Sequence, residues 1–262
     1  MVEQDKDALQ TDRLISSVIM SAVIHSLTDE SFKNFLGLAN IPKYRFTPSS
    51  TLDEELLSAA LRFNSRKVSE ELIDIACRDR SGLFHFSGVI ETLLPSDIST
   101  AADYAEHLNK EIAELRCFGA NERFVDFVAT ISAHECFGYL ESTYKIHHLP
   151  FDLDDRAEDV LKRALAHNNV AEVIGLLWSS VKSCLAKLRS GKMSEFCAAE
   201  AVIPNFERLL IRARKERWQL TPYGRSVYIP QSRLSRIVFD DVIQISDDGY
   251  SFSVDWFKQQ FL

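Results

Sequence analysis

Basic side chains near the carboxyl end of the chain form its clearest candidate for a binding site. From Glu207 to Arg236 there are eight basic and two acidic residues, a local charge of +6 in a chain whose net charge is −8. On a helix, Arg208, Arg212 and Lys215 follow one another at i, i+4 and i+7 and so share one face. Such a face can bind DNA phosphates or an acidic protein surface. The residues expected to make these contacts are Arg208, Arg212, Arg214, Lys215, Arg217 and Arg225.

Two other interpretations of these basic residues stay open. They could form a solvated helix face, or they could dock on acidic residues of the same chain, because the rest of the sequence carries −14. The interpretations differ in what neutralises the guanidinium groups: solvent ions, carboxylates of the chain itself, or a polyanionic partner.

The residues that follow this helix resemble part of a known DNA-binding fold. The segment Trp218-Gln-Leu-Thr-Pro-Tyr-Gly-Arg225 is similar, over eight residues, to the Leu-Thr-x-x-Gly-Arg segment of winged-helix proteins. In that family a helix is followed by a β-hairpin wing, and both contact DNA. The resemblance implies a small α+β module in which Arg212, Lys215, Arg217 and Arg225 contact the DNA backbone.

A second motif offers a catalytic alternative. The segment Arg78-Asp-Arg80-Ser-Gly-Leu-Phe-His85 resembles the motif of the all-helical HEPN ribonucleases, in which four to six residues separate an arginine from a histidine. There the histidine handles protons and the arginine stabilises charge that develops on the phosphate. The resemblance implies a metal-independent ribonuclease that uses Arg78, Arg80 and His85. Alternatively, His85 lies between two phenylalanines as a partly buried, hydrogen-bonded residue. HEPN nucleases and winged-helix accessory subunits both occur in prokaryotic defence systems.

Histidine and carboxylate side chains on two neighbouring predicted helices could approach a metal ion. They are Asp103, His107 and Glu111 on the first helix and His134, Glu135 and Glu141 on the second. Their spacing differs from the repeated Glu-x-x-His of metal sites in helix bundles. Glu106 and Lys110 on the first helix are typical of an ordinary charged face. We therefore expect no metal, and no cofactor either, because the chain has no glycine-rich phosphate loop.

The elements that must position these residues are almost all helices. Apolar residues recur three and four positions apart, as at Leu14, Val18 and Ala22. We predict helices at 7–27, 29–39, 52–64, 66–78, 83–94, 100–117, 121–146, 153–167, 170–190 and 193–217. After Trp218, β-prone runs at 226–229, 237–245 and 250–254 predict short strands.

The predicted fold is therefore mainly α, with a multi-helix body and a small C-terminal α+β module that resembles a winged helix. The helical body would cover 1–200, with a sub-boundary near 148–152. The basic helix and the β-containing module would cover 201–262.

Composition favours a cytoplasmic protein. The five cysteines are an odd number without any Cys-x-x-Cys pair, which is typical of reduced thiols. The first residues lack the basic region of a secretory signal, and serines interrupt the apolar run from Leu14 to Ile24, which is too short to span a bilayer. No membrane partner is expected.

Together these patterns predict a non-catalytic accessory subunit of a multiprotein complex. Its helical body would dock on a protein partner, and its basic C-terminal module would contact DNA or an acidic protein surface. The alternative is the HEPN-like ribonuclease.

Overall fold

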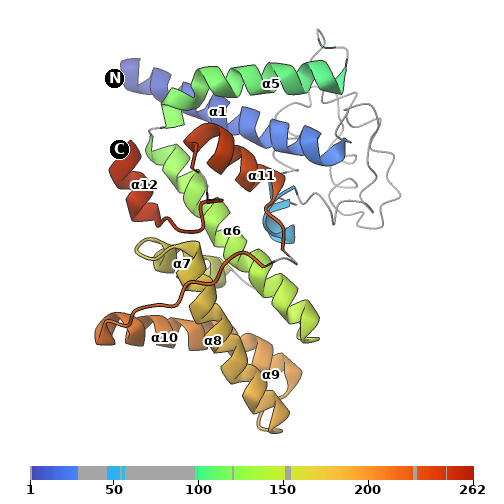
Figure 1. The fold of residues 1–262 in the computed structure, drawn as a ribbon, viewed down its shortest axis with the longest axis vertical. Coiled ribbons are helices and arrows are strands. Elements are labelled where there is room, and N and C mark those ends of the chain that lie inside the picture. The colour runs from blue at the N-terminus through green and yellow to red at the C-terminus, as the bar shows by residue number, and fades with distance from the viewer. Residues whose placement is uncertain are drawn as a thin grey trace. The chain divides into compact units, whose positions relative to one another are not determined.

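Helices account for the regular structure of the chain in the computed structural model (Figure 1). The structure describes residues 2–28, 46–53, 55–56, 98, 100–119, 121–150, 155–226, 229–245 and 247–262. None of these residues lies in a β-strand. The mainly-α prediction is thus confirmed, whereas the predicted C-terminal α+β module with a winged-helix hairpin is wrong for the described residues. None of the described helices combines the length and the apolar content that crossing a bilayer requires.

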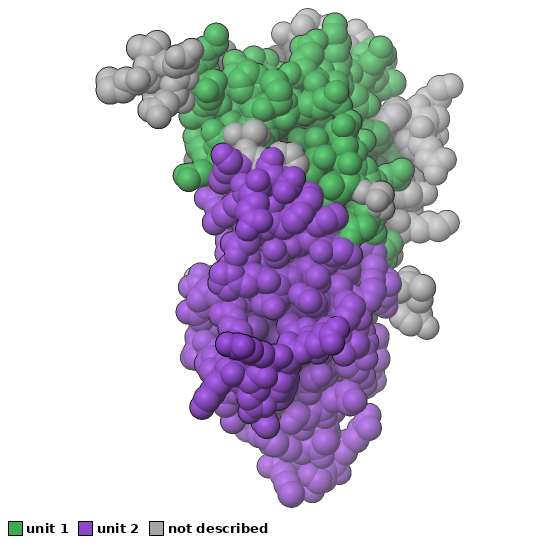
Figure 2. Space-filling view, turned by 60° about the vertical axis from the view of Figure 1, so that its left-hand side comes forward, with its two compact units in different colours: residues 1–124, 230–248 green, residues 125–229, 249–262 purple. Residues whose placement is uncertain are grey.

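The chain folds as two compact units, and each is discontinuous in sequence (Figure 2). Unit 1 comprises Met1–Phe124 and Pro230–Asp248, and unit 2 comprises Val125–Ile229 and Gly249–Leu262. The chain passes from one unit to the other after Phe124, Ile229 and Asp248. The C-terminal segment is therefore shared between the units.

Unit 1 is built on two long helices that lie side by side (Figure 1). Helix α1 (Val2–Leu27) packs against α5 (Ala101–Leu115), which continues as the 3-10 helix η2 (Arg116–Gly119). The amide of Asp103 donates to the hydroxyl of Thr100, which caps the first turn of α5. Tyr104, Leu108 and Ile112, at four-residue intervals, are buried along one face of that helix.

A short C-terminal helix pair completes unit 1. Helix α11 (Arg233–Arg236) runs directly into the π-helix η3 (Ile237–Ile243) and packs against α1. The strand predicted at 237–245 is therefore wrong. Its β-branched residues suggested a strand, but Leu234, Val238 and Val242 recur at four-residue intervals and are all buried, which is the pattern of a helix face.

The helices of unit 2 are α6 (Glu122–Ile146), of which the part from Val125 belongs to this unit, α7 (Asp155–Leu165), α8 (Val170–Arg189), α9 (Glu195–Glu200), α10 (Val202–Glu216) and α12 (Val254–Phe261). Helix α8 begins with a capping box, in which Asn169 and Glu172 each bond the other's backbone amide. It packs against α10, with Leu177, Val181 and Phe206 buried in the core.

The helix predicted at 193–217 is broken in two at Ala201, where α9 ends and α10 begins. Pro204 explains the break. In a continuous helix its ring would collide with the carbonyl of Glu200, and it has no N–H to donate there. After the break it lies in the first turn of α10, where the N–H needs no intrahelical partner.

The segment 218–226 crosses α8 without forming a strand. The amide of Tyr223 donates to the carbonyl oxygen of Ala171, at 2.9 Å. The approach is so close that a Cβ atom on Gly175 would lie 2.3 Å from the backbone oxygen of Thr221. The strand predicted at 250–254 is also wrong, since Val254 begins α12. Of the strand predicted at 226–229, residues 227–228 lie outside the described residues, and the amide of Ile229 donates to the carbonyl of Ser226.

Several predicted helices lie outside the described residues, namely 29–39, 66–78 and 83–94. Of the helix predicted at 52–64, residues 52–53 and 55–56 are described and are helical.

The contact at Gly175 gives a first prediction. Gly175→Ala should lower the free energy of unfolding, because the clash with the Thr221 carbonyl costs about 2 kcal/mol and outweighs the gain of about 1 kcal/mol in helix propensity. Gly224→Ala is the matched control, since its Cβ would meet nothing within 4 Å. Urea unfolding of both variants measures the difference. Equal stability of the two variants would contradict the tight packing of this segment on α8.

Candidate functional site

Helix α10 places the predicted basic residues on the side opposite its core stripe. Its buried residues are Val202, Ile203, Phe206, Leu210 and Ala213. On the opposite side Arg208, Ile211, Arg212 and Lys215 are all exposed, and they follow at i, i+3, i+4 and i+7. We call these four residues the α10 face. Ile211, 61% exposed, is the apolar member of this face.

Arg212 is held in place by its neighbours on the surface. Its Nε donates to Oε1 of Glu216 at 2.9 Å, and its guanidinium lies 5.2 Å from the ring centroid of Trp218. Glu216 also accepts a 2.8 Å hydrogen bond from Nε1 of Trp218. The hydrogen bonds from Arg212 and then from Trp218 lower the pKa of the Glu216 carboxyl. Arg212 is therefore orientated, although its side chain remains 63% exposed.

The other cations of α10 differ in how far the chain itself uses them. Arg208 Nη2 donates to Oδ1 of Asn205 at 3.2 Å. Arg214 Nη2 donates to the carbonyl of Arg163 at 3.0 Å and so ties α10 to the end of α7. The side chains of Lys215 and Arg217 make no hydrogen bond or ion pair with the described residues. Arg217 ends the helix in a left-handed conformation, with φ of 53°.

Arg225 does not join the α10 face. It forms a two-pronged ion pair with Glu135 of α6, at 2.9 and 3.3 Å, and its guanidinium lies 4.2 Å from the ring centroid of Tyr250. The side chains of Arg225 and Glu135 are only 14% and 2% exposed. Arg225 thus anchors the segment that resembles the winged-helix motif to the core of unit 2.

One cation near α10 was missed by the sequence analysis. Burial raises the pKa of the Cys184 thiol, while the charges of Lys187 and Arg208 act in the opposite direction. Lys187 belongs to α8, so a cation outside α10 acts on the same thiol as Arg208. The signal was present in the sequence: Lys182, Lys187, Arg189 and Lys192 follow one another without an intervening acidic residue.

The remaining candidates have other surroundings. Arg78, Arg80 and His85 lie outside the described residues, so their arrangement stays a prediction. Within the described residues, no group of three or more His, Cys, Asp or Glu side chains converges as metal ligands would. The carboxylates considered for a metal bind protein groups instead: Asp103 accepts from Thr100, Glu111 from Arg13 and Ser17, and Glu135 from Arg225.

His134 is a buried, neutral histidine in unit 2. Its side chain is 2% exposed, and its Nε2 lies 3.9 Å from a carboxylate oxygen of Glu158. Burial lowers its pKa to about 4, and this effect outweighs the attraction of Glu158, while Lys162 lowers the pKa further. The ring stacks on Phe137, with centroids 5.1 Å apart. This environment is that of a packed core residue.

No protein-family model matches the chain, and no curated protein or solved structure is significantly similar to it. The winged-helix and HEPN resemblances rest on the quoted residues alone.

The ion pair at Arg225 gives a second prediction. Arg225→Met should lower the free energy of unfolding by about 3 kcal/mol, because it leaves the carboxylate of Glu135 buried and uncompensated. The double variant Arg225→Met with Glu135→Leu should regain much of the lost free energy of unfolding. The control is Arg212→Met, which removes an exposed pair and should cost under about 1 kcal/mol. If Arg225→Met is no more harmful than Arg212→Met in urea unfolding, the pair does not hold the segment.

A third prediction concerns pH. The unfolded chain protonates His134 near its ordinary pKa of 6.5, whereas the folded protein does so only near 4. The neutral ring of His134 makes its full contribution to the free energy of unfolding above pH 6.5. That contribution declines as the pH falls towards 4, by about 2 kcal/mol between pH 7 and pH 5. His134→Gln should lose correspondingly less stability over this interval than the parent. The exposed His107→Gln serves as control and should behave like the parent, and an equal loss in both variants would contradict the assignment.

Proposed function

We propose that the chain is a non-catalytic accessory subunit of a multiprotein complex, and that the α10 face binds an acidic surface of a protein partner. One observation carries this proposal: Ile211, 61% exposed, lies among Arg208, Arg212 and Lys215 on the same side of α10. Protein interfaces commonly have an apolar centre and a polar rim, and arginine is enriched in them.

The exposed isoleucine favours a protein over DNA as the partner. Phosphate contacts require cations and hydrogen-bond donors, and they gain nothing from a large apolar side chain at their centre. Burying Ile211 against an apolar group would contribute about 2 kcal/mol.

The surroundings of Arg212 suit the capture of a carboxylate. Glu216 and Trp218 already fix the orientation of the guanidinium, so less side-chain entropy is lost when it meets a partner. Lys215 and Arg208, at the edge of the same face, would mainly accelerate association through long-range attraction.

The experiment compares two defined probes by fluorescence anisotropy: an amphipathic helical peptide with leucine on one side and glutamate on the other, and a duplex DNA. We expect the peptide to bind more tightly at physiological salt. Ile211→Asp should weaken peptide binding at least about tenfold, as expected for the central residue of an interface. The double variant Arg212→Glu and Lys215→Glu should have a similar effect. Lys110→Glu, at an exposed position of α5, is the matched control and should leave binding unchanged.

Two results would contradict the proposal. Duplex DNA could bind more tightly than the peptide, lose affinity steeply with added salt and be indifferent to Ile211→Asp, which would favour the DNA-binding interpretation. Alternatively, the peptide could bind equally well to the parent and to both α10 variants, and the α10 face would then have no part in recognition.

A further inference from the structure

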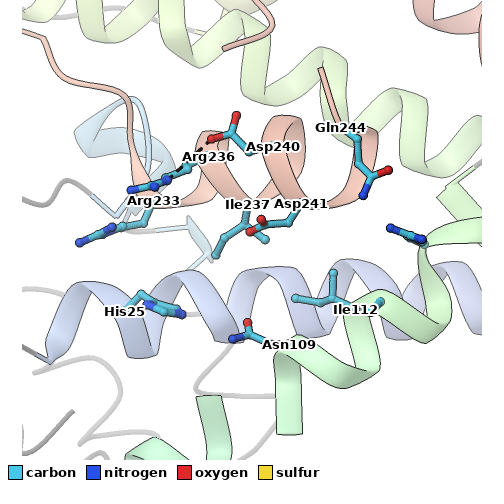
Figure 3. A pocket seen from close by; sticks show the side chains of 11 residues that line it. His25, Asn109, Ile112, Arg233, Arg236, Ile237, Asp240, Asp241 and Gln244 are labelled. Atoms are coloured by element: carbon cyan, nitrogen blue, oxygen red, sulfur yellow. Dashed lines mark ion pairs between the residues drawn. The ribbon is translucent and has the colours of Figure 1, made fainter. Parts of the chain in front are cut away.

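A pocket of about 570 Å³ opens within unit 1, between α1, α5 and the pair α11 and η3 (Figure 3). Two helix faces supply most of its lining. Helix α5 contributes Asn109, Ile112, Ala113 and Arg116, and the C-terminal pair contributes Arg233, Arg236, Ile237, Asp240, Asp241 and Gln244. His25 of α1 completes the lining. The volume is in the range of small-molecule sites.

Two of the three arginines that line this pocket, Arg233 and Arg236, lie at one end of it, and Arg116 is the third. Arg233 and Arg236 project from the same side of α11 towards the end where His25 lies (Figure 3). Burial lowers the pKa of His25, and the charges of Arg233 and Arg236 lower it further. Arg236 has an ion pair with Asp240 whose atoms are 3.7 Å apart, and its side chain is 61% exposed. The guanidinium groups thus act on the same small region that His25 borders.

The rest of the pocket carries acidic and amide side chains. Asp241 points from η3 into the space above Asn109, and Gln244 stands further along at the end of η3 (Figure 3). Burial raises the pKa of both Asp240 and Asp241, and neighbouring carboxylates raise it further. These groups accept or exchange hydrogen bonds with hydroxyl groups. Ile112, Ala113 and Ile237 provide an apolar surface beside them.

The backbone on the C-terminal side of the pocket is irregular. The π-helix η3 carries Asp240 and Asp241, and such helices occur frequently at functional sites. Gln244, which ends η3, has a left-handed conformation with φ of 62°. Helices commonly end on a residue in this conformation, as α10 does at Arg217.

We propose that this pocket binds a small phosphorylated polyol, a sugar phosphate or a nucleotide. Arg233 and Arg236 bind the phosphate, since guanidinium groups form strong charge-assisted hydrogen bonds with phosphate oxygens. Asp241 and Asn109 bind the hydroxyl groups. The lining carries both a cationic end and an acidic, amide-rich centre, and a ligand with a phosphate and several hydroxyls complements both.

Isothermal titration calorimetry with ribose 5-phosphate, AMP, ribose and inorganic phosphate tests the proposal. Ribose 5-phosphate and AMP should bind at millimolar concentrations or below, and ribose and inorganic phosphate at least about tenfold more weakly. Tighter binding of AMP than of ribose 5-phosphate would identify a nucleotide, and equal binding would identify a sugar phosphate. Either result supports the pocket.

Substitutions locate the binding. Arg236→Gln should weaken both phosphorylated ligands about tenfold, and Arg236→Lys should retain part of the affinity. Asp241→Asn should weaken ribose 5-phosphate but not inorganic phosphate. Arg123→Gln is the matched control, because Arg123 lies in unit 1, is 58% exposed and pairs with Asp12 outside the pocket. The proposal is overturned if neither phosphorylated ligand binds, if inorganic phosphate binds as tightly as ribose 5-phosphate, or if Arg236→Gln binds like Arg123→Gln.

Discussion

The ion pair between Arg225 and Glu135 is the constraint on which the arrangement of unit 2 depends. Both side chains are nearly removed from water, so each charge requires the other. Arg225 lies in the segment that follows α10, so pairing it with Glu135 holds the segment 218–226 against α6. Gly175 permits this path, since any side chain there would meet the backbone of Thr221. The course of the chain after α10 therefore follows from one buried charge and one missing Cβ.

The arginines of this chain show why residue type and spacing do not determine a role. Arg212, Arg225 and Arg236 belong to the same basic segment of the sequence, yet one lies over an exposed tryptophan, one is buried against a carboxylate and one borders a pocket. The partner of Arg225 is 90 residues away in sequence. Periodicity within a helix describes neighbours along that helix and carries no information about such distant partners. The face formed by Arg208, Arg212 and Lys215 could be predicted because all three belong to one helix.

Individual helices, like the α10 face, could be predicted because their signals lie within one segment of the sequence. Helices such as α5, α6 and α8 have apolar stripes and local caps, and these signals lie within each segment. The strand predicted at 237–245 failed because β-branched residues there suggested a strand more strongly than the four-residue spacing of Leu234, Val238 and Val242 suggested a helix. Ser232, which caps α11 by accepting from the amide of Ser235, was the additional local signal for a helix. The pocket had no such signal, because its two main faces lie more than a hundred residues apart in sequence.

The discontinuity of both units limits what any fragment of the chain can form. Leu234, Val238 and Phe239 are each at most 1% exposed in unit 1, although they lie in the last part of the sequence. Phe206 and Phe257 are likewise at most 1% exposed in unit 2. A chain ending near 200 would therefore leave apolar side chains of α1 and α5, and of α8, without the residues that cover them, and exposing that area would forfeit about 25 cal/mol per Å². Contacts between such distant segments form late in folding, because the loop between them must close first. Neither the α10 face nor the pocket can be positioned until the C-terminal residues have joined both units.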